Sequence, residues 1–224
     1  RVVILEVILR SWWVRRGAGL AVGAGLLLTM VLLYRDTLSF GFLRWDDNVN
    51  IYRNAALISG DWPRFWKEGF FGLYIPLSYT VWTWLYTWGG PDAGVFRILN
   101  LSLHLSNTAL LFLLLRQWAR SWSSDHAFVA FFGAAFFALH PLQVETVAWV
   151  SGGRDLMSAF FGLLACLAAV RLPGACGQFL GVALFTLGML CKPALAALPV
   201  LVWLWLRFAR GIPWRQALGW FALW

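Results

Sequence analysis

Six long apolar runs restrict what this 224-residue chain can fold into. They cover about residues 17–34, 95–115, 127–141, 154–171, 178–191 and 194–208, and a seventh begins near residue 214. A helix needs about 20 apolar residues to cross the hydrocarbon core, and fewer when flanking side chains reach the interface. In lipid every backbone polar group must be satisfied within the protein, which favours helices. The runs therefore predict an all-α fold, a polytopic membrane helical bundle with six to seven transmembrane helices.

The composition supports a membrane protein over a basic soluble one. Apolar residues make up 61% of the chain and charged residues only 12%, which is far from the usual soluble range. The formal net charge of +8 would point to nucleic acid in a soluble protein. Here the basic residues are scattered between apolar runs and form no stripe. We therefore expect membrane lipids, and no nucleic acid, as partners.

The distribution of charge predicts an orientation. If the N-terminus is cytoplasmic, ten basic and two acidic residues fall on the cytoplasmic side, whereas eight basic and eight acidic residues fall outside. The positive-inside rule favours this arrangement. We expect an integral, multi-pass protein whose polar site faces the periplasm or a lumen.

The segments outside the apolar runs predict a simple domain organisation. Residues 1–16 mix apolar and basic positions, which is typical of a cytoplasmic amphipathic segment on the membrane surface. Residues 17–224 form the transmembrane domain, and 35–94 are its first outer loop. Tryptophan and tyrosine recur in this loop, which favours juxtamembrane helices at the headgroup level. A short span over 76–89 would instead move six later arginines to the outer side, so the charge distribution disfavours it.

The chain has no initiating methionine and stops inside the seventh apolar run, so we expect a fragment truncated at its C-terminus.

Polar residues gather on the predicted outer side. Adjacent carboxylates, Asp46 and Asp47, follow the first apolar run in the stretch "FLRWDDNVNIY". The other candidates are Asn100, His104, Asn107, His140, Glu145, Arg154, Asp155 and Lys192. Ionisable groups within or against spans are costly and usually mark a substrate site. Each single charge has the alternative of being solvated or paired with a neighbour.

Adjacent aspartates at a membrane edge suit general-base chemistry. One carboxylate accepts a proton from an acceptor hydroxyl, while its neighbour or a nearby arginine adjusts its proton affinity. Arg154 and Lys192 suit a phosphate group. Together these residues indicate group transfer from a lipid-phosphate donor. A histidine with several carboxylates is a conceivable divalent-metal site, but no HxxE or HExxH spacing is present, so we expect no metal and no other cofactor.

Four stretches resemble one known family in their order and spacing. They are "FLRWDDNVNIYRNAAL", "PLSYTVWTWLY" with "VFRILNLSLHLSNTALLFLLL", "FFALHPLQVETVAWVSGGRDLMSAFFGLLA" and "CKPALAALPVLVWLWL". Over about residues 20–208 the chain resembles the membrane region of the transmembrane and tetratricopeptide-repeat protein O-mannosyltransferases and their bacterial relatives, which are members of the C-type glycosyltransferase superfamily. The run H-P-x-x-x-E-x-V-A-W-V-S-G is the most specific part.

The resemblance implies a membrane glycosyltransferase that moves a sugar from a polyprenyl-phosphate donor to a hydroxyl, often of a protein Ser or Thr. It implies that the base is Asp46 or Asp47. We predict that the donor phosphate or the sugar is bound by Arg154, Lys192, His140, Glu145, Asp155, His104 and Asn100. A tetratricopeptide-repeat region usually follows the membrane part in this family.

The chain departs from the family pattern at three places. Ile75 stands where relatives carry Arg before Pro-Leu; Gly153 and Arg154 stand where they carry Arg-Lys; and Cys191 and Pro193 flank Lys192 in place of Ser and Glu. These departures support an alternative hypothesis, a catalytically degenerate relative that serves as a structural or accessory subunit of a larger membrane complex. A transporter is disfavoured, because the polar residues do not follow a path through the bilayer.

Overall fold

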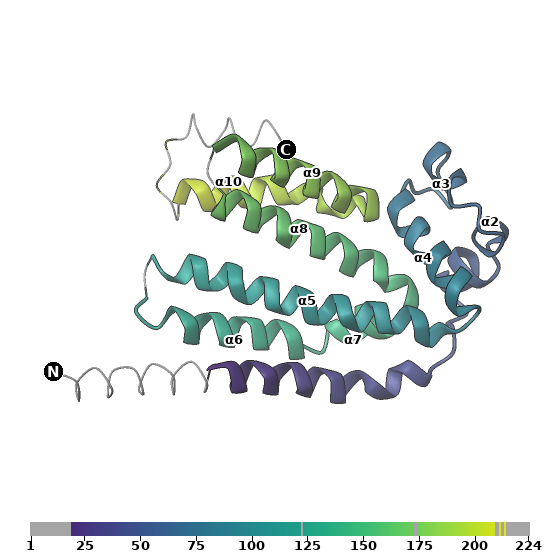
Figure 1. Cartoon of the computed structure of the whole chain (residues 1–224), viewed down its shortest axis with the longest axis horizontal. Coiled ribbons are helices and arrows are strands. Elements are labelled where there is room, and N and C mark those ends of the chain that lie inside the picture. Colours follow the sequence, from purple (N-terminus) through teal and green to yellow (C-terminus); the bar gives the residue numbers. More distant parts are fainter. Residues whose placement is uncertain (1–18, 122, 173, 209–210, 212, 214–224) are drawn as a thin grey trace, which may run out of the picture.

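The structure is a computed structural model that describes residues 19–121, 123–172, 174–208, 211 and 213. Most of these residues are helical (Figure 1). Within these residues there is no strand, and only an isolated bridge joins Phe70 to Leu73. The predicted all-α fold is therefore confirmed. The predicted amphipathic segment 1–16 and the helix expected from residue 214 lie outside the described residues.

Four helices in the described chain are long and apolar enough to cross a membrane. The first is Gly19–Ser39, whose last turn is the 3-10 helix η1 (Arg35–Ser39), and the second is α5 (Ala93–Ala119). The third is Val150–Arg171, which consists of η3 (Val150–Gly152) followed by α8 (Gly153–Arg171), and the fourth is α9 (Gly174–Cys191). Two shorter apolar helices are α6 (His126–Leu139) and Pro193–Trp205. The second consists of η4 (Pro193–Ala197) and most of α10 (Leu198–Phe208). The chain is thus an integral membrane protein by length and composition of its helices, while the count of six to seven spans stays a prediction.

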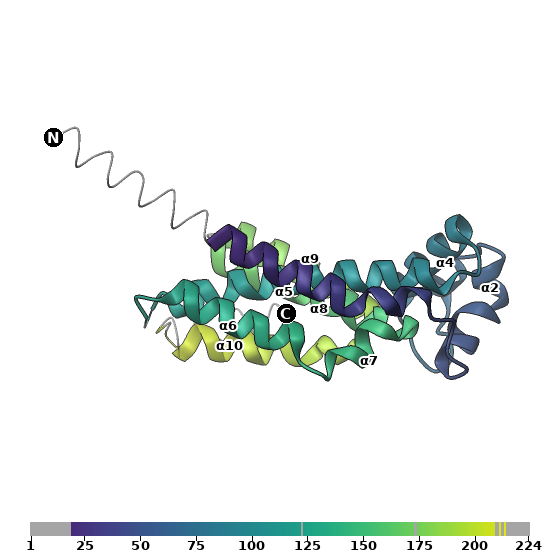
Figure 2. The same cartoon turned by 90° about the horizontal axis from the view of Figure 1, so that it is seen from below.

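The long helices lie side by side, and successive ones run in opposite directions (Figures 1 and 2). The helix α5 is central: it packs against α6 on one side and α8 on the other, and α8 packs against α9. One end of the bundle carries residues 35–92, the short helix α7 (Gln143–Ala148) and the turn at Lys192. We call it the capped end. The turns that follow α5 and α8 lie at the opposite end.

The cap consists of short helices with their own apolar core. They are η2 (Asn48–Tyr52), α2 (Ala55–Ile58), α3 (Arg64–Lys67) and α4 (Pro76–Gly89). The Asn54 side chain caps α2 by accepting from Leu57 N–H, and Pro76 occupies the first turn of α4, where a missing N–H does no harm. The ring of Phe65 stacks on Tyr79 with centroids 4.4 Å apart. The loop therefore folds over the end of the bundle instead of trailing into solvent.

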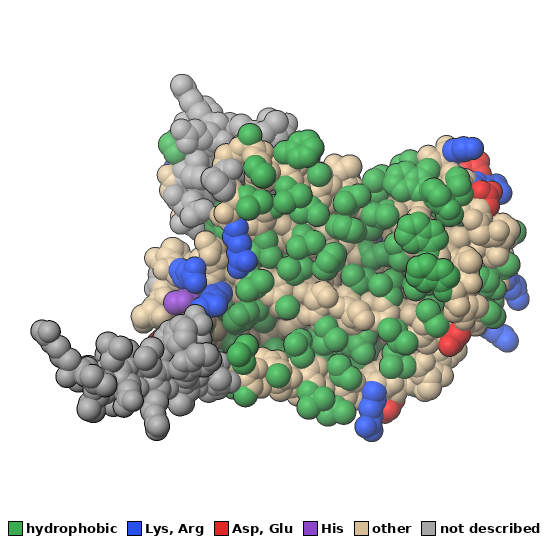
Figure 3. Space-filling view, viewed as in Figure 1, with side chains coloured by type: hydrophobic (Ala, Val, Ile, Leu, Met, Phe, Trp, Pro, Cys, Tyr) green, Lys and Arg blue, Asp and Glu red, His purple; other side chains and the backbone are tan. Residues whose placement is uncertain are grey.

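Charged side chains concentrate at the two ends of the bundle, with a hydrophobic band between them (Figure 3). On the face shown, the capped end carries both acidic and basic groups, whereas basic groups alone are visible at the opposite end. This arrangement is the one expected of a bundle that spans a bilayer. Which end faces the cytoplasm stays a prediction.

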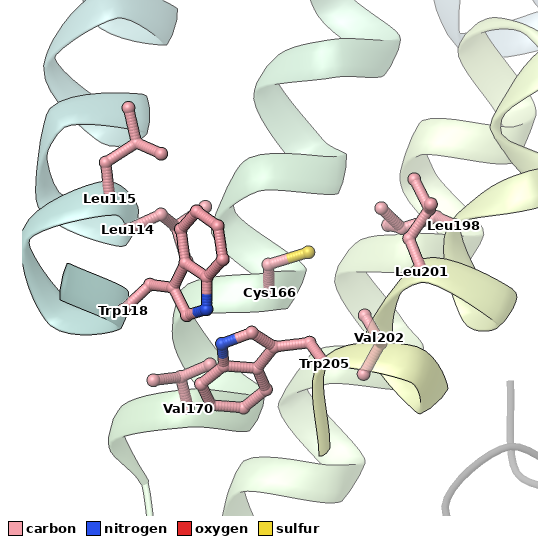
Figure 4. Close-up of a pocket in the computed structure, with 9 residues that line it drawn as sticks. All are labelled: Leu114, Leu115, Trp118, Cys166, Val170, Leu198, Leu201, Val202 and Trp205. Carbon is pink, nitrogen blue, oxygen red and sulfur yellow. The ribbon is translucent and has the colours of Figure 1, made fainter. Parts of the chain in front are cut away.

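The contact between α10 and the rest of the bundle leaves a small apolar gap. A cavity of about 220 Å³ separates α10 from α5 and α8 toward the opposite end (Figure 4). Leu114 and Trp118 of α5, Cys166 of α8, and Leu201 and Trp205 of α10 point toward it. The helix α10 is therefore fixed mainly near its start, where η4 meets α8 and α9.

Glycines allow that contact. A Cβ placed on Gly188 of α9 would lie 2.3 Å from Leu195 Cδ2 and 3.3 Å from the Ser158 carbonyl oxygen. On Gly162 of α8 it would lie 2.7 Å from Leu195 Cδ1. Close approach of helices through small residues is the usual way in which membrane helices gain packing energy. The Leu195 side chain thus occupies space that two glycines leave open.

We predict that Gly188→Val destabilises the bundle by about 1–3 kcal/mol, because a branched side chain there overpacks the contact with Leu195. Thermal unfolding of the purified protein in detergent measures this. The control is Gly25→Val, where a Cβ meets nothing within 4 Å, and it should not lower the melting temperature. Equal melting temperatures for the two variants would contradict the packing assigned to Gly188.

Candidate functional site

Asp47 is a buried acceptor that joins the first loop to the start of α8. Its Oδ1 accepts from both the backbone N–H (3.0 Å) and the hydroxyl (2.6 Å) of Ser151, and its Oδ2 accepts from the N–H of Leu43 (3.0 Å). Its side chain has no exposed surface. Three donors thus satisfy a carboxylate that water does not reach, and such charge-assisted bonds are the stronger kind.

Arg97 of α5 joins the same two segments from the other side. Its Nε donates to the carbonyl of Ala148 (2.7 Å), and its two terminal nitrogens donate to the carbonyls of Gly41 (2.6 Å) and Phe40. The residue is 1% exposed. Residues 40–47 are therefore held against residues 148–151 by two buried ionisable groups of opposite charge. We call this contact the seam.

Asp46 is the accessible member of the aspartate pair. Its Oδ2 accepts from an Nη of Arg154 at 3.2 Å, and 26% of the Asp46 side chain is exposed, against 11% for Arg154. The Arg154 guanidinium lies over the ring of Trp149, 5.8 Å from its centroid. Adjacent residues of a helical turn point about 100° apart, so the neighbours Asp46 and Asp47 have different environments.

Three polar atoms of Arg154, of Trp149 beneath it and of Asn48, two residues after Asp46, are buried without a hydrogen-bond partner in the described part of the chain. They are Asn48 Oδ1, Trp149 Nε1 and Arg154 Nε. The great majority of buried polar atoms are satisfied by protein or ordered water. The unpaired donors Arg154 Nε and Trp149 Nε1 are therefore suited to the hydroxyl or phosphate oxygens of a ligand.

A second ion pair lies next to the first. Lys192 Nζ contacts a carboxylate oxygen of Asp155, which directly follows Arg154 at the start of α8. About a third of each side chain is exposed, 33% for Lys192 and 37% for Asp155. The structure thus places two ion pairs, Asp46 with Arg154 and Asp155 with Lys192, at the capped end, and we call them the ion-pair cluster.

A hydrogen-bonded chain connects α4 to the seam. The Tyr79 hydroxyl donates to Asn50 Oδ1 at 2.7 Å, and Asn50 Nδ2 donates to the Ser151 hydroxyl at 3.4 Å. Burial raises the pKa of Tyr79 above its ordinary value, the nearby charge of Arg154 lowers it, and that of Asp46 raises it further. Tyr79 therefore stays protonated at neutral pH and acts as a donor.

The polar stripe of α5 lies within helix contacts. Asn100 Nδ2 donates to the carbonyls of Trp149 (2.8 Å) and Val147 (3.4 Å). His104 bonds through Nε2 to the carbonyl of Ala138 (3.0 Å). These two side chains hold backbone of neighbouring elements. The His104 ring also contacts Tyr34 of the first helix (centroids 5.7 Å apart) and Phe137 of α6 (5.5 Å), and these contacts do not involve the ion-pair residues.

His140 and Glu145 flank the turn between α6 and α7. His140 ends α6, and its Nδ1 accepts from the N–H of Leu142 at 3.2 Å. Glu145 is exposed on α7. No hydrogen bond or ion pair among the described residues joins either side chain to Asp46 or Lys192. Nor does that part of the chain contain a group of three His, Cys, Asp or Glu side chains suited to a metal ion.

Sequence reasoning missed Arg97, Ser151 and Tyr79. Arg97 counted only as one outer-side charge, although an arginine at the start of a 27-residue apolar helix is itself a signal of a specific partner. Ser151 and Tyr79 carry no such signal, because hydroxyls are common in helices and their partners lie far away in sequence.

These features define a class of protein: an integral membrane helical bundle with a cluster of paired aspartates and cations under a folded cap at one end. The chain is similar to curated protein O-mannosyl-transferases. It is 32% identical over 162 residues to protein O-mannosyl-transferase Tmtc1 of Drosophila melanogaster, covering 66% of this chain and 18% of the relative. It is 33% identical over 153 residues to protein O-mannosyl-transferase Tmtc2 of the same fly, covering 62% and 16%.

A mammalian relative gives a similar result. The mouse protein O-mannosyl-transferase TMTC2 is 26% identical over 150 residues. The chain spans less than a fifth of the length of each of these relatives. No protein-family model and no solved structure matches the chain.

We predict that Asp47→Ala destabilises the protein by about 3 kcal/mol or more, because it leaves two N–H groups and one hydroxyl at the buried seam without an acceptor. Chemical or thermal unfolding in detergent measures the loss. Asp36→Ala is the matched control, since Asp36 is 79% exposed and pairs only with its neighbour Arg35, where little is lost. The seam would have no special importance if both variants unfolded like the parent.

Proposed function

We propose that this chain is part of a membrane glycosyltransferase that moves a sugar from a polyprenyl-phosphate donor to a hydroxyl of an acceptor, in the first place a protein Ser or Thr. The observation that carries the proposal is the accessible Asp46, paired with Arg154, whose Nε is buried without a hydrogen-bond partner among the described residues. The O-mannosyl-transferase names of the relatives support the same reaction class.

In this proposal the two adjacent aspartates have different roles. Asp46 accepts the proton of the acceptor hydroxyl, because its carboxylate is partly exposed and, within the described residues, its partner is an arginine that a ligand can displace. Asp47 is a positioning residue: all its bonds go to the seam, and it fixes the turn that carries Asp46. A general base must lie within hydrogen-bond reach of the proton that it removes, and Asp46 meets this condition for a ligand in the cluster.

The cations serve the leaving group. As the acceptor oxygen forms its bond to the anomeric carbon, the bond from that carbon to the phosphate oxygen breaks, and the phosphate leaves with the electron pair. Arg154 and Lys192 stabilise the charge that develops there. Arg154 Nε is buried and has no hydrogen-bond acceptor within the described residues. In this proposal a phosphate oxygen of the donor supplies that acceptor. The inversion of the anomeric carbon follows from direct displacement.

The remaining predicted residues form the rim of the site in this proposal. Asn100 holds the carbonyls beside Trp149, and Asp155 holds Lys192 in place. His140 and Glu145 contact the sugar or the acceptor from the α7 side. His104 acts at a distance, through the packing of α5 on α6.

The orientation and domain limits of the sequence analysis complete the proposal. The capped end faces the periplasm or a lumen, and residues 1–16 lie on the cytoplasmic side. Residues 17–224 form the transmembrane domain, with 35–94 as its first outer loop. Donor lipid, acceptor protein and other membrane subunits are the partners, and no metal or cofactor takes part.

A second candidate function is a non-catalytic subunit of a membrane complex. It is favoured by the ion pairs themselves, because both cations are already neutralised by aspartates. It is also favoured by Ile75, which is buried at 1% exposure and provides no charge to the site. Stoichiometric co-purification with other membrane proteins, together with no transfer activity, would select this candidate.

We predict that Asp46→Asn lowers the rate of transfer at least about 100-fold, since general-base catalysis contributes ~10²–10⁴-fold. The measurement is transfer of mannose from a polyprenyl-phosphate donor to a Ser- or Thr-containing acceptor by the full-length protein in detergent. Asp36→Asn, an exposed aspartate at the same end, is the control. Unchanged activity in Asp46→Asn would overturn the role of Asp46, provided that both variants unfold at the parent temperature.

We predict that Lys192→Gln raises the donor KM about tenfold with a smaller effect on the acceptor KM, because it removes one cation from the phosphate. Lys67→Gln, at an exposed position of the cap, controls for loss of a positive charge. Steady-state kinetics with each substrate varied in turn measures both constants. Equal donor KM values for the two variants would exclude Lys192 from the phosphate site.

A further inference from the structure

An apolar groove lies between the helix Gly19–Ser39, α5 and α6, away from the cap. Its volume is about 740 Å³, within the usual range for ligand pockets. Leu27 belongs to its first wall, Ala109 and Phe112 to α5, and Phe131 to α6. Thr108 contributes the one hydroxyl of the lining, and this hydroxyl already donates to the carbonyl of His104 at 2.9 Å. The groove therefore presents almost no polar group to an occupant.

The groove is open because small residues line it. A Cβ placed on Gly19 or Gly23 meets nothing within 4 Å. Alanines at 24, 109, 127 and 134 also face it. Interfaces between membrane helices use small residues to bring backbones together, whereas here the helices stay apart and the space remains. The missing side-chain volume is thus available to a second molecule.

The opening faces the surroundings of the bundle. Lining residues Leu20 and Phe128 are 76% and 64% exposed. Only 11% of the apolar window of Gly19–Ser39 is buried within the protein. Since this helix is one of the four that are long enough to span, the groove opens toward hydrocarbon. An acyl chain is the apolar molecule available at that depth.

A cation marks one end of the groove. The α5 residues that line it include Phe112 and Leu113, and Arg116 follows them at i+4 and i+3 on the same helix face. Arg116 is not itself a lining residue, but helical side chains point back toward the N-terminus, so its position one turn beyond Phe112 and Leu113 puts it next to this end of the groove. Its Nε is buried and has no hydrogen-bond partner within the described residues. A buried guanidinium nitrogen that lacks an acceptor is suited to a phosphate oxygen.

We infer that this groove binds an acyl chain of an anionic membrane phospholipid, whose phosphate contacts Arg116. The inference goes beyond the proposed transferase and does not depend on it. At ~1.5 Å per residue, Arg116 lies roughly 28 Å along α5 from Arg97 of the seam, which is close to the thickness of the hydrocarbon core. The bound lipid therefore belongs to the leaflet opposite the capped end, and is a different molecule from a sugar donor at Asp46.

The binding test uses delipidated protein in detergent and native mass spectrometry. Dioleoyl phosphatidylglycerol and dioleoyl phosphatidylcholine are titrated separately. The expected result is a saturable site that binds phosphatidylglycerol about fivefold more tightly, the contribution of one arginine to an anionic lipid. Equal affinity for the two lipids, or no saturable binding, would overturn the inference.

Two kinds of variant separate the headgroup from the acyl chain. Arg116→Gln should remove the preference for phosphatidylglycerol. Arg120→Gln should keep it, because Arg120 is exposed at the same end and bonds to Gln117. If both variants keep the preference, or both lose it to the same extent, Arg116 does not hold the phosphate.

Filling the groove should abolish saturable binding of both lipids. Ala109→Trp fills it from α5 and Gly23→Trp from the first helix, so that one variant decides if the other fails to fold. Val200→Trp is the control, since Val200 is 45% exposed on α10 and outside the groove. Retained binding in the filled variants would overturn the inference. So would a dimer of the parent chain that Ala109→Trp converts to monomers, because the occupant would then be a second copy.

Discussion

The seam between residues 40–47 and 148–151 is the contact on which the cap and the site both depend. Asp47 and Arg97 are buried, carry opposite charges, and bond almost entirely to backbone. A buried ionised group without partners costs several kcal/mol. Separating residues 40–47 from residues 148–151 would break bonds of both Asp47 and Arg97, so the two segments stay together. The seam therefore fixes the start of the cap, whose apolar core continues into α5 and α8.

The position of the seam explains how the ion-pair cluster is assembled. Asp46 precedes Asp47, and Arg154 follows Ser151 by three residues, so both members of the outer ion pair lie within about one helical turn of a seam residue. Small movements of the first loop are thus limited at Asp46. A catalytic group needs such support from neighbours that are themselves held by packing and hydrogen bonds. In the proposed transferase, stability is concentrated in Asp47 and Arg97, which leaves Asp46 accessible for the reaction.

The sequence predicts the helices well, because apolar runs of spanning length have few other folds available in a membrane. It also predicts that Asp46, Arg154, Asp155 and Lys192 meet at one end, because successive spans alternate in direction. It does not separate Asp46 from Asp47, since adjacent acids look alike until the backbone places one inward and the other outward. The same limit applies to Asn100 and His104. Their spacing predicts a shared face of α5, but not that their partners are carbonyls of α6, of α7 and of Trp149 just after α7.

The helix α5 carries one buried and one half-buried cation, one near each end. The two differ in the hydrogen-bond acceptors that the chain gives them. Arg97 has three carbonyl acceptors from its own chain, whereas Arg116 has a buried Nε without one in the described chain. Charged groups at membrane depth are tolerated when they are paired or reach the interface. Arg97 meets this condition through the fold itself. For Arg116 the inferred phospholipid would supply the missing acceptor at Nε, while its acyl chain occupies the apolar groove at this end of α5.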